Sequence, residues 1–467
     1  MAHQFHPSVL REYDIRGVIG ETLGPDDARA IGRSFATLLR EAGGMRVAVG
    51  FDGRVSSPML EHALVEGLTA SGCDVVRIGL GPTPMLYYAE ASGADVHGGI
   101  QVTGSHNPAN HNGFKMVFQG RPFFGVDILR LGEIAAAGQW AHGAGGVESG
   151  AVLGEYVDRL LGALDGIDLS TLAGLKVGWD AGNGAAGPAI ERLVQRLPGE
   201  HHLLYTHVDG HFPNHHPDPT VEANLTDLKA LVAERQLDFG VAFDGDGDRI
   251  GAIDGTGRVV WGDQLLAIFA EDLLQRQPGA TVIADVKASQ ALFDHVAARG
   301  GQPLMWKTGH SLIKAKMKET GAPLAGEMSG HVFFADSYFG FDDALYAAVR
   351  LIAACTRMGR SLSELRGAMP AMHNTPELRF QVDDSRKFAA IDEIASRISA
   401  SGAVVDTTDG VRVTEADGWW LLRASNTQDV LVARAESDSA AGLARLLGQL
   451  DEQLALSGLV RPADAEH

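Results

Sequence analysis

The stretch GGIQVTGSHNPANHNGFKM, residues 98 to 116, joins a short apolar segment to a run of turn-forming and chemically active residues. Residues 98–102 predict a strand entered from a pair of glycines, and the Gly, Asn and Pro that follow predict a turn. Ser105 is therefore expected on a loop at the end of a strand, which is where the sheets of α/β proteins place their chemistry. A serine in such a turn can also serve only to close it through its hydroxyl group. The stretch by itself leaves both interpretations open.

Three further apolar segments predict strands that each lead into a polar turn and then into a helix-like segment. They are VAVGFDGR at 47–54, KVGWDAGNG at 176–184 and TVIADVKAS at 281–289. The segments begin roughly 100 to 130 residues apart, which is too long for a solenoid repeat and typical of repeated α/β domains. A chain of 467 residues also exceeds one ordinary core, and about 150 residues per domain gives three or four domains.

Roughly the last hundred residues follow a different pattern. The segment 378–382 predicts a strand, and a helix is expected to begin at about Ser385. Residues 404–425 predict hairpin strands and residues 440–456 a closing helix, so we expect a separate α+β module. The glycine-rich stretch 138–150 is expected to be a linker or exposed connection. The expected domain ranges are 1–150, 151–253, 254–366 and 367–467.

The composition limits the classes of function. A formal net charge of −20 argues against a general nucleic-acid-binding protein. It does not exclude anionic substrates, because local clusters of arginine, lysine and metal can reverse the field inside a cleft. The first residues contain no apolar signal segment, and no stretch approaches the roughly 18 uncharged apolar residues of a membrane span, so we expect a cytoplasmic protein without a membrane partner. Cys73 and Cys355 lack metal-ligand spacing and are expected to be small buried hydrophobic residues.

Three aspartates follow an apolar strand in FGVAFDGDGDR, residues 239–249. Asp244, Asp246 and Asp248 alternate with glycines, so their carboxylates can turn toward one point, as the ligands of a hard cation do. An EF-hand loop begins in the same way, but its sixth position needs Gly where this chain has Arg249, and its twelfth needs Glu where it has Gly. Three carboxylates this close repel one another without a cation. A metal site is therefore favoured over a plain acidic turn.

Two further segments carry groups suited to ligand binding. In GEMSGH, residues 326–331, Glu327, Ser329 and His331 alternate and suit several contacts to one polyhydroxylated ligand. Such residues on an exposed loop are also commonly just solvated. RASNTQ, residues 423–428, offers a guanidinium, hydroxyls, an amide and backbone N–H groups, which together suit a phosphate-binding nest. An ordinary Ser-Asn turn with one surface arginine is the alternative.

These motifs together resemble the α-D-phosphohexomutase family. TGSHNP, NGFK, DGDGDR, GEMSGH and RASNT occur in the family's order and spacing, and REYDIRG at 11–17 is similar to its N-terminal signature. The resemblance covers essentially the whole chain and is greatest to the bacterial phosphomannomutase/phosphoglucomutase branch, with phosphoglucosamine mutase as an alternative. It implies a four-domain, heart-shaped α/β enzyme with three similar α/β domains, a C-terminal α+β domain and a central active-site cleft.

The resemblance also implies roles for individual residues. Ser105 matches the serine that is phosphorylated in the active enzymes and that completes the metal site with Asp244, Asp246 and Asp248. Lys115 and His331 match positions implicated in proton transfer or in steadying the phosphoserine. The residues implied for catalysis are Ser105, Lys115, His106, Arg249 and His331. The residues implied for substrate binding are Tyr13, Arg16, Lys287, His310, Glu327, Ser329, Arg423, Ser425, Asn426 and Thr427.

The implied activity is the reversible interconversion of hexose 1-phosphate and hexose 6-phosphate, with mannose and glucose as the sugars. Phosphoserine lends its phosphate to the sugar and recovers the other one from a bound 1,6-bisphosphate. Mg²⁺ is the implied cofactor, glucose 1,6-bisphosphate the implied activator, hexose phosphates the expected partners and a monomer the expected state. The pair Gln428-Asp429 departs from the family, many of whose members continue Thr-Pro, and it places an acid beside the phosphate nest.

Two other classes of function compete with this one. An aspartyl-phosphate phosphatase also introduces its nucleophile at the end of an apolar strand, with Asp244 attacking and Asp246 as the acid, but Asp248 stands where that motif needs Thr or Val. A labile acyl phosphate would identify it, whereas the mutase carries an acid-stable phosphoserine. A non-catalytic sugar-phosphate sensor on the same scaffold is the second alternative, and the intact Ser105 and aspartate triad argue against it.

Overall fold

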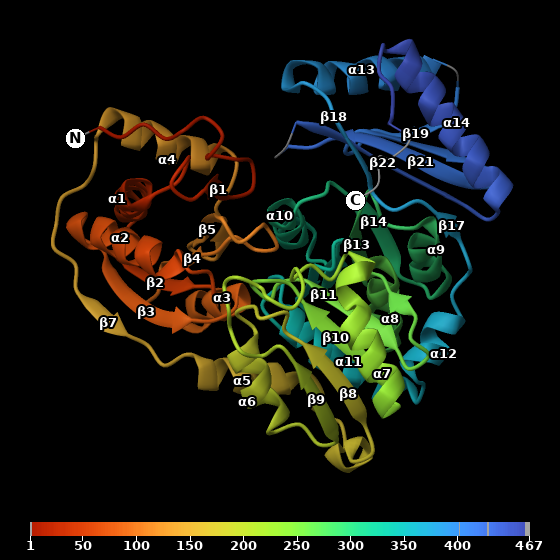
Figure 1. The fold of residues 1–467 in the computed structure, drawn as a ribbon, viewed down its shortest axis with the longest axis horizontal. Helices are drawn as coiled ribbons and strands as arrows, with labels where there is room; N and C mark the ends of the chain where they lie inside the picture. The colour runs from red at the N-terminus through yellow and green to blue at the C-terminus, as the bar shows by residue number, and fades with distance from the viewer. Residues whose placement is uncertain (1, 401, 427–428, 463–467) are drawn as a thin grey trace.

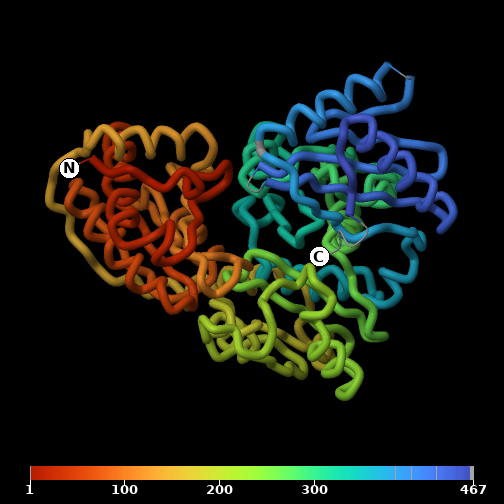
Figure 2. Tube along the Cα trace, turned by 45° about the horizontal axis from the view of Figure 1, so that its top comes forward, coloured from red at the N-terminus to blue at the C-terminus, as the bar shows by residue number. Residues whose placement is uncertain are grey.

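The computed structural model describes residues 2–400, 402–426 and 429–462. Within these residues the chain forms four sheets in succession, of seven, five, four and six strands, and we number the domains 1 to 4 after them. Figure 1 shows domain 1 in red and orange and domain 4 in blue as two lobes, with domains 2 and 3 between them. Figure 2 shows the same two lobes on opposite sides of this body. The expected four-domain, heart-shaped architecture is confirmed.

Domain 1 is a three-layer unit built on a mixed sheet. Its strands are β1 (Ile15–Val18), β2 (Arg46–Phe51), β3 (Asp74–Leu80), β4 (Gly98–Val102), β5 (His111–Phe118), β6 (Arg121–Pro122) and β7 (Val147–Ser149). Its helices are α1 (Pro25–Glu41), α2 (Ser57–Ala70), α3 (Thr83–Ser92) and α4 (Val126–Ala137). Val47 and Val49 of β2 join the buried cluster of α1 and α2, whereas Ala48 joins that of α3. Because strand side chains alternate, the helices cover both faces of the sheet.

One expectation for domain 1 is only partly right. The stretch 138–150 was expected to be a connection, yet its last part forms β7, which pairs in parallel with β3. The glycines that suggested a linker permit this pairing, because a Cβ at Gly145 would lie 1.9 Å from the carbonyl oxygen of Cys73. The chain therefore adds a short edge strand before it leaves domain 1.

Domains 2 and 3 are also α/β units, and they share one core with part of domain 1. Domain 2 contains β8 (Lys176–Asp180), β9 (Glu200–Leu204), β10 (Phe239–Phe243), β11 (Ile250–Asp254), β12 (Val259–Val260), α5 (Leu153–Leu161), α6 (Gly187–Val194) and α7 (Thr226–Arg235). Domain 3 contains α8 (Gly262–Arg276), β13 (Thr281–Asp285), α9 (Gln290–Ala298), β14 (Gln302–Trp306), α10 (His310–Thr320), β15 (Leu324–Gly326), β16 (Val332–Phe334), α11 (Ala344–Met358) and α12 (Leu362–Gly367). A single buried cluster runs from α3 through both domains.

Domain 4 is the expected α+β module, with an antiparallel sheet. It contains β17 (His373–Asn374), β18 (Leu378–Gln381), α13 (Asp384–Ala400), β19 (Val404–Asp406), β20 (Val411–Glu415), β21 (Gly418–Ala424), β22 (Val430–Ser437) and α14 (Ala440–Leu456). Helices α13 and α14 cover one face of the sheet and form a separate core with it. On the other face Trp419 and Leu421 pack against Val286 of domain 3.

The expected strands at 98–102, 47–54, 176–184 and 281–289 are confirmed as β4, β2, β8 and β13. The sequence did not indicate β22, although it is buried throughout and lies inside the sheet of domain 4. In the part of the chain that the structure describes, no helix has both the length and the apolar character needed to cross a membrane.

Candidate active site

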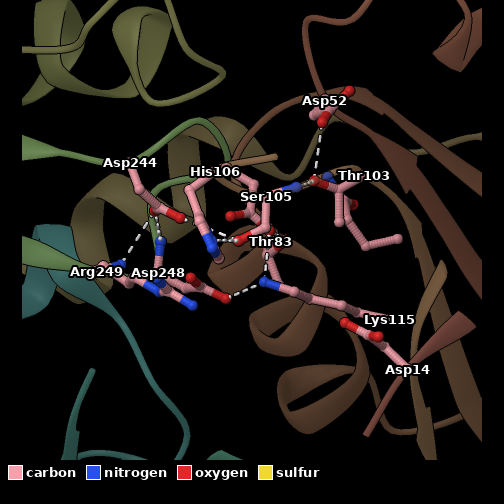
Figure 3. Close-up of polar contacts among 12 residues, drawn as sticks. Asp14, Asp52, Thr83, Thr103, Ser105, His106, Lys115, Asp244, Asp248 and Arg249 are labelled. Carbon is pink, nitrogen blue, oxygen red and sulfur yellow. Dashed lines mark hydrogen bonds and ion pairs between the residues drawn. The ribbon is translucent and has the colours of Figure 1, made fainter. Parts of the chain in front are cut away.

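Ser105 lies on the loop after β4, as expected, and hydrogen bonds with Thr103 and Asp52 hold this loop. The serine is 1% exposed and adopts a left-handed backbone with φ of 50°. Its N–H donates to Thr103 Oγ1 at 2.9 Å. The hydroxyl of Thr103 and the N–H of Gly104 donate to Asp52 Oδ2 at 2.8 and 3.1 Å. These contacts fix the backbone on which the serine is presented (Figure 3).

The aspartate triad follows β10 and faces this serine. Asp244, Asp246 and Asp248 are fully buried, and one oxygen of each lies within 4.8 Å of the others. Ser105 Oγ donates to Asp244 Oδ2 at 3.1 Å. Burial, followed by the charges of Asp246 and Asp248, raises the pKa of Asp244 well above its usual range. Among the described residues, Asp246 Oδ1 and Asp248 Oδ1 have no hydrogen-bond partner. These free lone pairs, on hard oxygen donors, fit a divalent cation.

Lys115 lies between two of these carboxylates. It extends from β5 opposite Gln101 of β4, and its Nζ donates to Asp246 Oδ2 at 2.7 Å and also to Asp248 Oδ2. Burial lowers the pKa of Lys115, but the charges of Asp246 and Asp248 outweigh it and raise that pKa above its usual value. The side chain is therefore an ammonium ion at neutral pH, and it brings positive charge close to Ser105.

His106 is the second group beside the serine hydroxyl. Its Nδ1 lies 3.2 Å from Ser105 Oγ. Burial lowers the pKa of His106 well below 6.5, and the charges of Arg249 and Arg16 lower it further. The imidazole is therefore neutral at neutral pH and can exchange a hydrogen bond with Ser105. Figure 3 shows Ser105, His106 and Lys115 directed toward Asp244 and Asp248.

His331 and His310 stack behind the triad and share one carboxylate. Their rings are 5.4 Å apart and nearly parallel, and His331 Nδ1 lies 3.1 Å from Asp342 Oδ2. Asp342 also pairs with His310 at 3.4 Å and accepts from Lys314 at 2.8 Å. Arg249 Nε donates to His331 Nε2 at 3.0 Å, so the proton of a neutral ring resides on Nδ1.

Asp248, His331 and Asp342 form a second acidic cluster, whose ligand atoms lie close enough together to hold a metal ion. A metal needs the lone pair of a histidine nitrogen. In this cluster Nε2 of His331 accepts from Arg249, and Nδ1 faces Asp342 Oδ2 at 3.1 Å, so the ring lies between a cation and a carboxylate.

The residues expected to bind the sugar lie in domain 3. Glu327 is 4% exposed and accepts the N–H of Gly309 at 2.6 Å. Ser329 is half-buried in the same loop between β15 and β16. Lys287 Nζ donates to Glu377 Oε1 at 2.6 Å, a residue just before β18 in domain 4. This ion pair connects the two domains beside the sugar loop.

The phosphate loop of domain 4 reaches the other domains through Tyr13. Arg423 Nε donates to Asp409 Oδ2 at 2.9 Å. Asn426 donates to the hydroxyl of Tyr13 at 2.6 Å, and that hydroxyl donates to the carbonyl of Thr308 at 3.0 Å. Burial raises the pKa of Tyr13 to about 12, which keeps the phenol protonated. Tyr13 thus joins domain 1 to domains 3 and 4.

Some expected residues fall outside these contacts. Ser425 is buried beside Arg423, whereas Arg16 pairs with Asp14 at 2.7 Å rather than with another expected site residue. Thr427 and Gln428 lie outside the described residues. The other expected residues fall into two groups. They belong to the contact network around Ser105, or they line the domain 3 and 4 loops linked by Tyr13.

Several residues that hold this site were not predicted from the sequence. Asp52 and Arg54 support the Ser105 loop, Asp342 orients two histidines, and Glu377 and Asp409 pair with expected cations. Only the first two carried a signal, because the segment 47–54 ends in Asp-Gly-Arg directly after a strand. The others pair with residues distant in sequence.

Models of known protein families match most of the chain. Family models for the phosphoglucomutase/phosphomannomutase domains match in chain order. The α/β/α domains I, II and III match residues 8–137, 154–257 and 261–372, and the C-terminal domain matches residues 377–453.

Individual relatives agree with these matches. The phosphomannomutase/phosphoglucomutase of Pseudomonas putida is 45% identical over 96% of this chain and 95% of its own. The phosphoglucomutase of Neisseria meningitidis serogroup A is 41% identical over 94% of this chain and 95% of its own. A solved phosphoglucomutase/phosphomannomutase family protein of Burkholderia thailandensis is 45% identical, covers 97% of this chain and 98% of its own, and superposes with a TM-score of 0.91. The chain therefore belongs to the phosphoglucomutase/phosphomannomutase family of phosphohexomutases.

Proposed function

We propose that this chain interconverts the 1-phosphates and 6-phosphates of glucose and mannose through a phosphoserine at Ser105. The observation that carries the proposal is the position of its hydroxyl, which is buried and 3.1 Å from Asp244, in the same triad whose Asp246 binds the ammonium group of Lys115. A serine that only closes a turn does not need three buried carboxylates and a lysine in front of it. With a cation on these carboxylates, the site suits a group with several negative oxygens.

The chemistry follows from two transfers at one serine. The free 6-hydroxyl of a hexose 1-phosphate attacks the phosphorus of the phosphoserine, the P–Oγ bond breaks, and Ser105 takes up a proton as the sugar hydroxyl loses one. The resulting 1,6-bisphosphate then reorients within the site, so that its C1 phosphate faces Ser105. Ser105 Oγ then attacks the phosphate at C1, and the released 1-hydroxyl takes the proton. The phosphoserine is restored and no phosphate is consumed.

The side chains around Ser105 suit different parts of this exchange. The Lys115 ammonium stabilises charge on the phosphoryl oxygens. The neutral imidazole of His106 is within reach of the Ser105 proton. Asp244, Asp246 and Asp248 would hold Mg²⁺, which when bound draws negative charge from the transferring phosphoryl group. Every residue of the proposed site lies on this one chain, so we propose that the monomer is the active unit.

The turn of the bisphosphate determines which sugars fit. The turn exchanges C1 with C6, and the 3- and 4-hydroxyls roughly trade places. Glu327 and Ser329 can therefore bind these two hydroxyls in both orientations. The 2-hydroxyl moves to a new position and cannot be held by one fixed partner. Glucose and mannose differ only at that hydroxyl, so we propose that both are substrates.

Intact-mass measurement and peptide mapping test the proposal directly. Incubation with glucose 1,6-bisphosphate should add one acid-stable phosphoryl group to the peptide that contains Ser105. The Ser105→Ala variant should take up none and should lose turnover of glucose 1-phosphate and mannose 1-phosphate, because the carrier of the phosphate is gone. Near-normal turnover in this variant would exclude the mechanism.

The same experiment separates the alternatives. An acid-labile adduct on Asp244 would support an aspartyl-phosphate phosphatase, and turnover restricted to glucosamine 1-phosphate would support a phosphoglucosamine mutase. A preference between glucose and mannose beyond about a thousandfold in kcat/KM, roughly 4 kcal/mol, would mean that the 2-hydroxyl is recognised after all.

A further inference from the structure

Arg54 makes an unusual set of contacts beneath the Ser105 loop. It follows β2 and is 1% exposed. One guanidinium nitrogen donates to the carbonyl of Pro108 at 2.6 Å and to that of His111 at 3.0 Å. The other donates to the carbonyls of Ser105 at 2.7 Å and Asn107 at 2.6 Å. Four backbone acceptors within seven residues thus converge on one planar cation.

The guanidinium is itself held on several sides. Asp52 Oδ2 lies 3.2 Å from its Nε, and Asp52 Oδ1 accepts the backbone N–H of Arg54 at 3.0 Å. The ring of Phe212, from domain 2, lies 5.3 Å from the guanidinium carbon. A Cβ at position 104 would stand 2.4 Å from Nε, so Gly104 leaves the space that the arginine occupies.

We propose that Arg54 is a positioning residue for phosphoryl transfer, which fixes the loop that carries Ser105. Ser105 needs support because a non-glycine residue with φ of 50° is in a disfavoured conformation. The proposal rests on the proposed function, in which this serine meets phosphorus twice per cycle from two different ends of the intermediate. A displacement of about 1 Å at such a group can cost about 100-fold in rate. Arg54 contacts no reacting atom and acts only through the loop.

Two matched variants of the full chain test the proposal. Arg54→Lys keeps the charge but loses the planar fork that reaches four carbonyls. Arg350→Lys is the control, because Arg350 is also buried, at 2% exposure, and binds both oxygens of Asp336 at 2.8 and 2.9 Å outside the site. We expect Arg54→Lys to lower kcat for glucose 1-phosphate at least 100-fold with KM changed less than threefold. Arg350→Lys should lower Tm by a similar amount and keep kcat within threefold.

Amide hydrogen exchange tests the proposal on the wild-type protein as well, so that the test does not depend on a variant that folds. In the wild type the amides of Gly104, Ser105, Asn107 and His111, which all donate hydrogen bonds, should be protected from exchange, with and without glucose 1,6-bisphosphate. In Arg54→Lys, but not in Arg350→Lys, the exchange of this loop should speed up selectively. An unprotected loop in the wild type, unchanged kcat in Arg54→Lys, or an equal loss of kcat in both variants would overturn the proposal. Absence of wild-type mutase activity would instead count against the proposed function, while the exchange data would still judge Arg54.

Discussion

At the scale of single residues, Asp246 connects the two halves of the site. Its Oδ2 accepts from Thr83 Oγ1 at 2.5 Å and from Lys115 at 2.7 Å, and its Oδ1 is left for a cation. We expect Asp246→Asn to raise the Mg²⁺ concentration for half-maximal activity at least tenfold and to lower kcat at least 100-fold. One of three anionic ligands is lost, and Lys115 loses a partner. A magnesium titration of the initial rate measures both effects.

Asp272 provides the control for this variant. It is 2% exposed and pairs with Arg357 at 2.9 Å and Arg276 at 3.0 Å, away from the triad. Asp272→Asn should lower Tm and leave the magnesium requirement unchanged. Identical magnesium titrations for wild type and Asp246→Asn would show that the triad does not hold the metal.

Single residues also show what the sequence could and could not indicate. Ser105 and the triad were identified because each motif carries its chemistry in a few consecutive residues. Asp342 and Glu377 were not predicted because each pairs with a residue far away in the sequence. Strand β16 separates Asp342 from His331, and most of domain 3 separates Glu377 from Lys287. A buried carboxylate becomes recognisable only when the fold supplies its cation.

At the scale of elements, the backbones of the metal loop and the serine loop also approach each other closely, besides the contact of Ser105 with Asp244. A Cβ at Gly245 would lie 2.4 Å from the carbonyl oxygen of Ser105. We expect Gly245→Ala to lower kcat about tenfold or more, because one loop must shift away from the other. Steady-state kinetics measure the effect. Gly174→Ala is the control, since a Cβ there meets no atom within 4 Å and kcat should be unchanged. Wild-type kcat in Gly245→Ala would show that the loops can separate without harm.

The start of α11 carries a buried acid that should make stability depend on pH. Asp343 accepts the N–H of Tyr346 and the hydroxyls of Tyr156 and Tyr338, so it joins domain 2 to domain 3. Burial raises the pKa of Asp343 to about 7. Between about pH 4 and pH 7 the folded chain then binds a proton that the unfolded chain has lost. Stability from this group is therefore fully present at low pH and falls as the pH rises through 7.

The variant Asp343→Asn tests this dependence. It cannot titrate, so the Tm of the wild type should fall relative to that of the variant between pH 5 and pH 8. Between pH 5 and the folded pKa of about 7 the change in free energy is at most about 3 kcal/mol, at roughly 1.4 kcal/mol per pH unit. Thermal melts of both proteins at the two pH values measure it. A constant difference in Tm would show that the carboxyl titrates at its ordinary pKa.

The strands also show which secondary structure the sequence patterns could and could not predict. Strands β2, β4, β8 and β13 were predictable because apolar runs end in clear turn residues. Strand β22 was not, because it follows the phosphate loop directly and its arginine and glutamate side chains break the apolar pattern. Both are buried by partners in domain 3: Arg434 lies 3.7 Å from Asp263, and Glu436 accepts from Ser289 at 2.8 Å.

At the scale of the whole molecule, the proposed function assigns phosphate binding to domain 4 and phosphoryl transfer to residues of domains 1 and 2. Arg423 already binds Asp409 through Nε, so its two terminal nitrogens are the ones that can face a phosphate. We expect Arg423→Lys to raise KM about tenfold or more with a smaller change in kcat, because lysine cannot bind Asp409 and a phosphate as one planar unit. Kinetics with glucose 1-phosphate and mannose 1-phosphate measure the change. A KM within twofold of wild type would show that a point charge suffices.

The separate core of domain 4 has a consequence for how this enzyme can change. Domains 2 and 3 share one buried cluster with α3 of domain 1, so these three domains are packed together. Domain 4 closes its own core with α13 and α14, and it meets domain 3 through Trp419 and Leu421 and through polar contacts such as Lys287–Glu377 and Arg434–Asp263. On the proposed function, substitutions in the core of domain 4 would therefore alter the support of the phosphate-binding loop without entering the buried cluster that domains 1, 2 and 3 share.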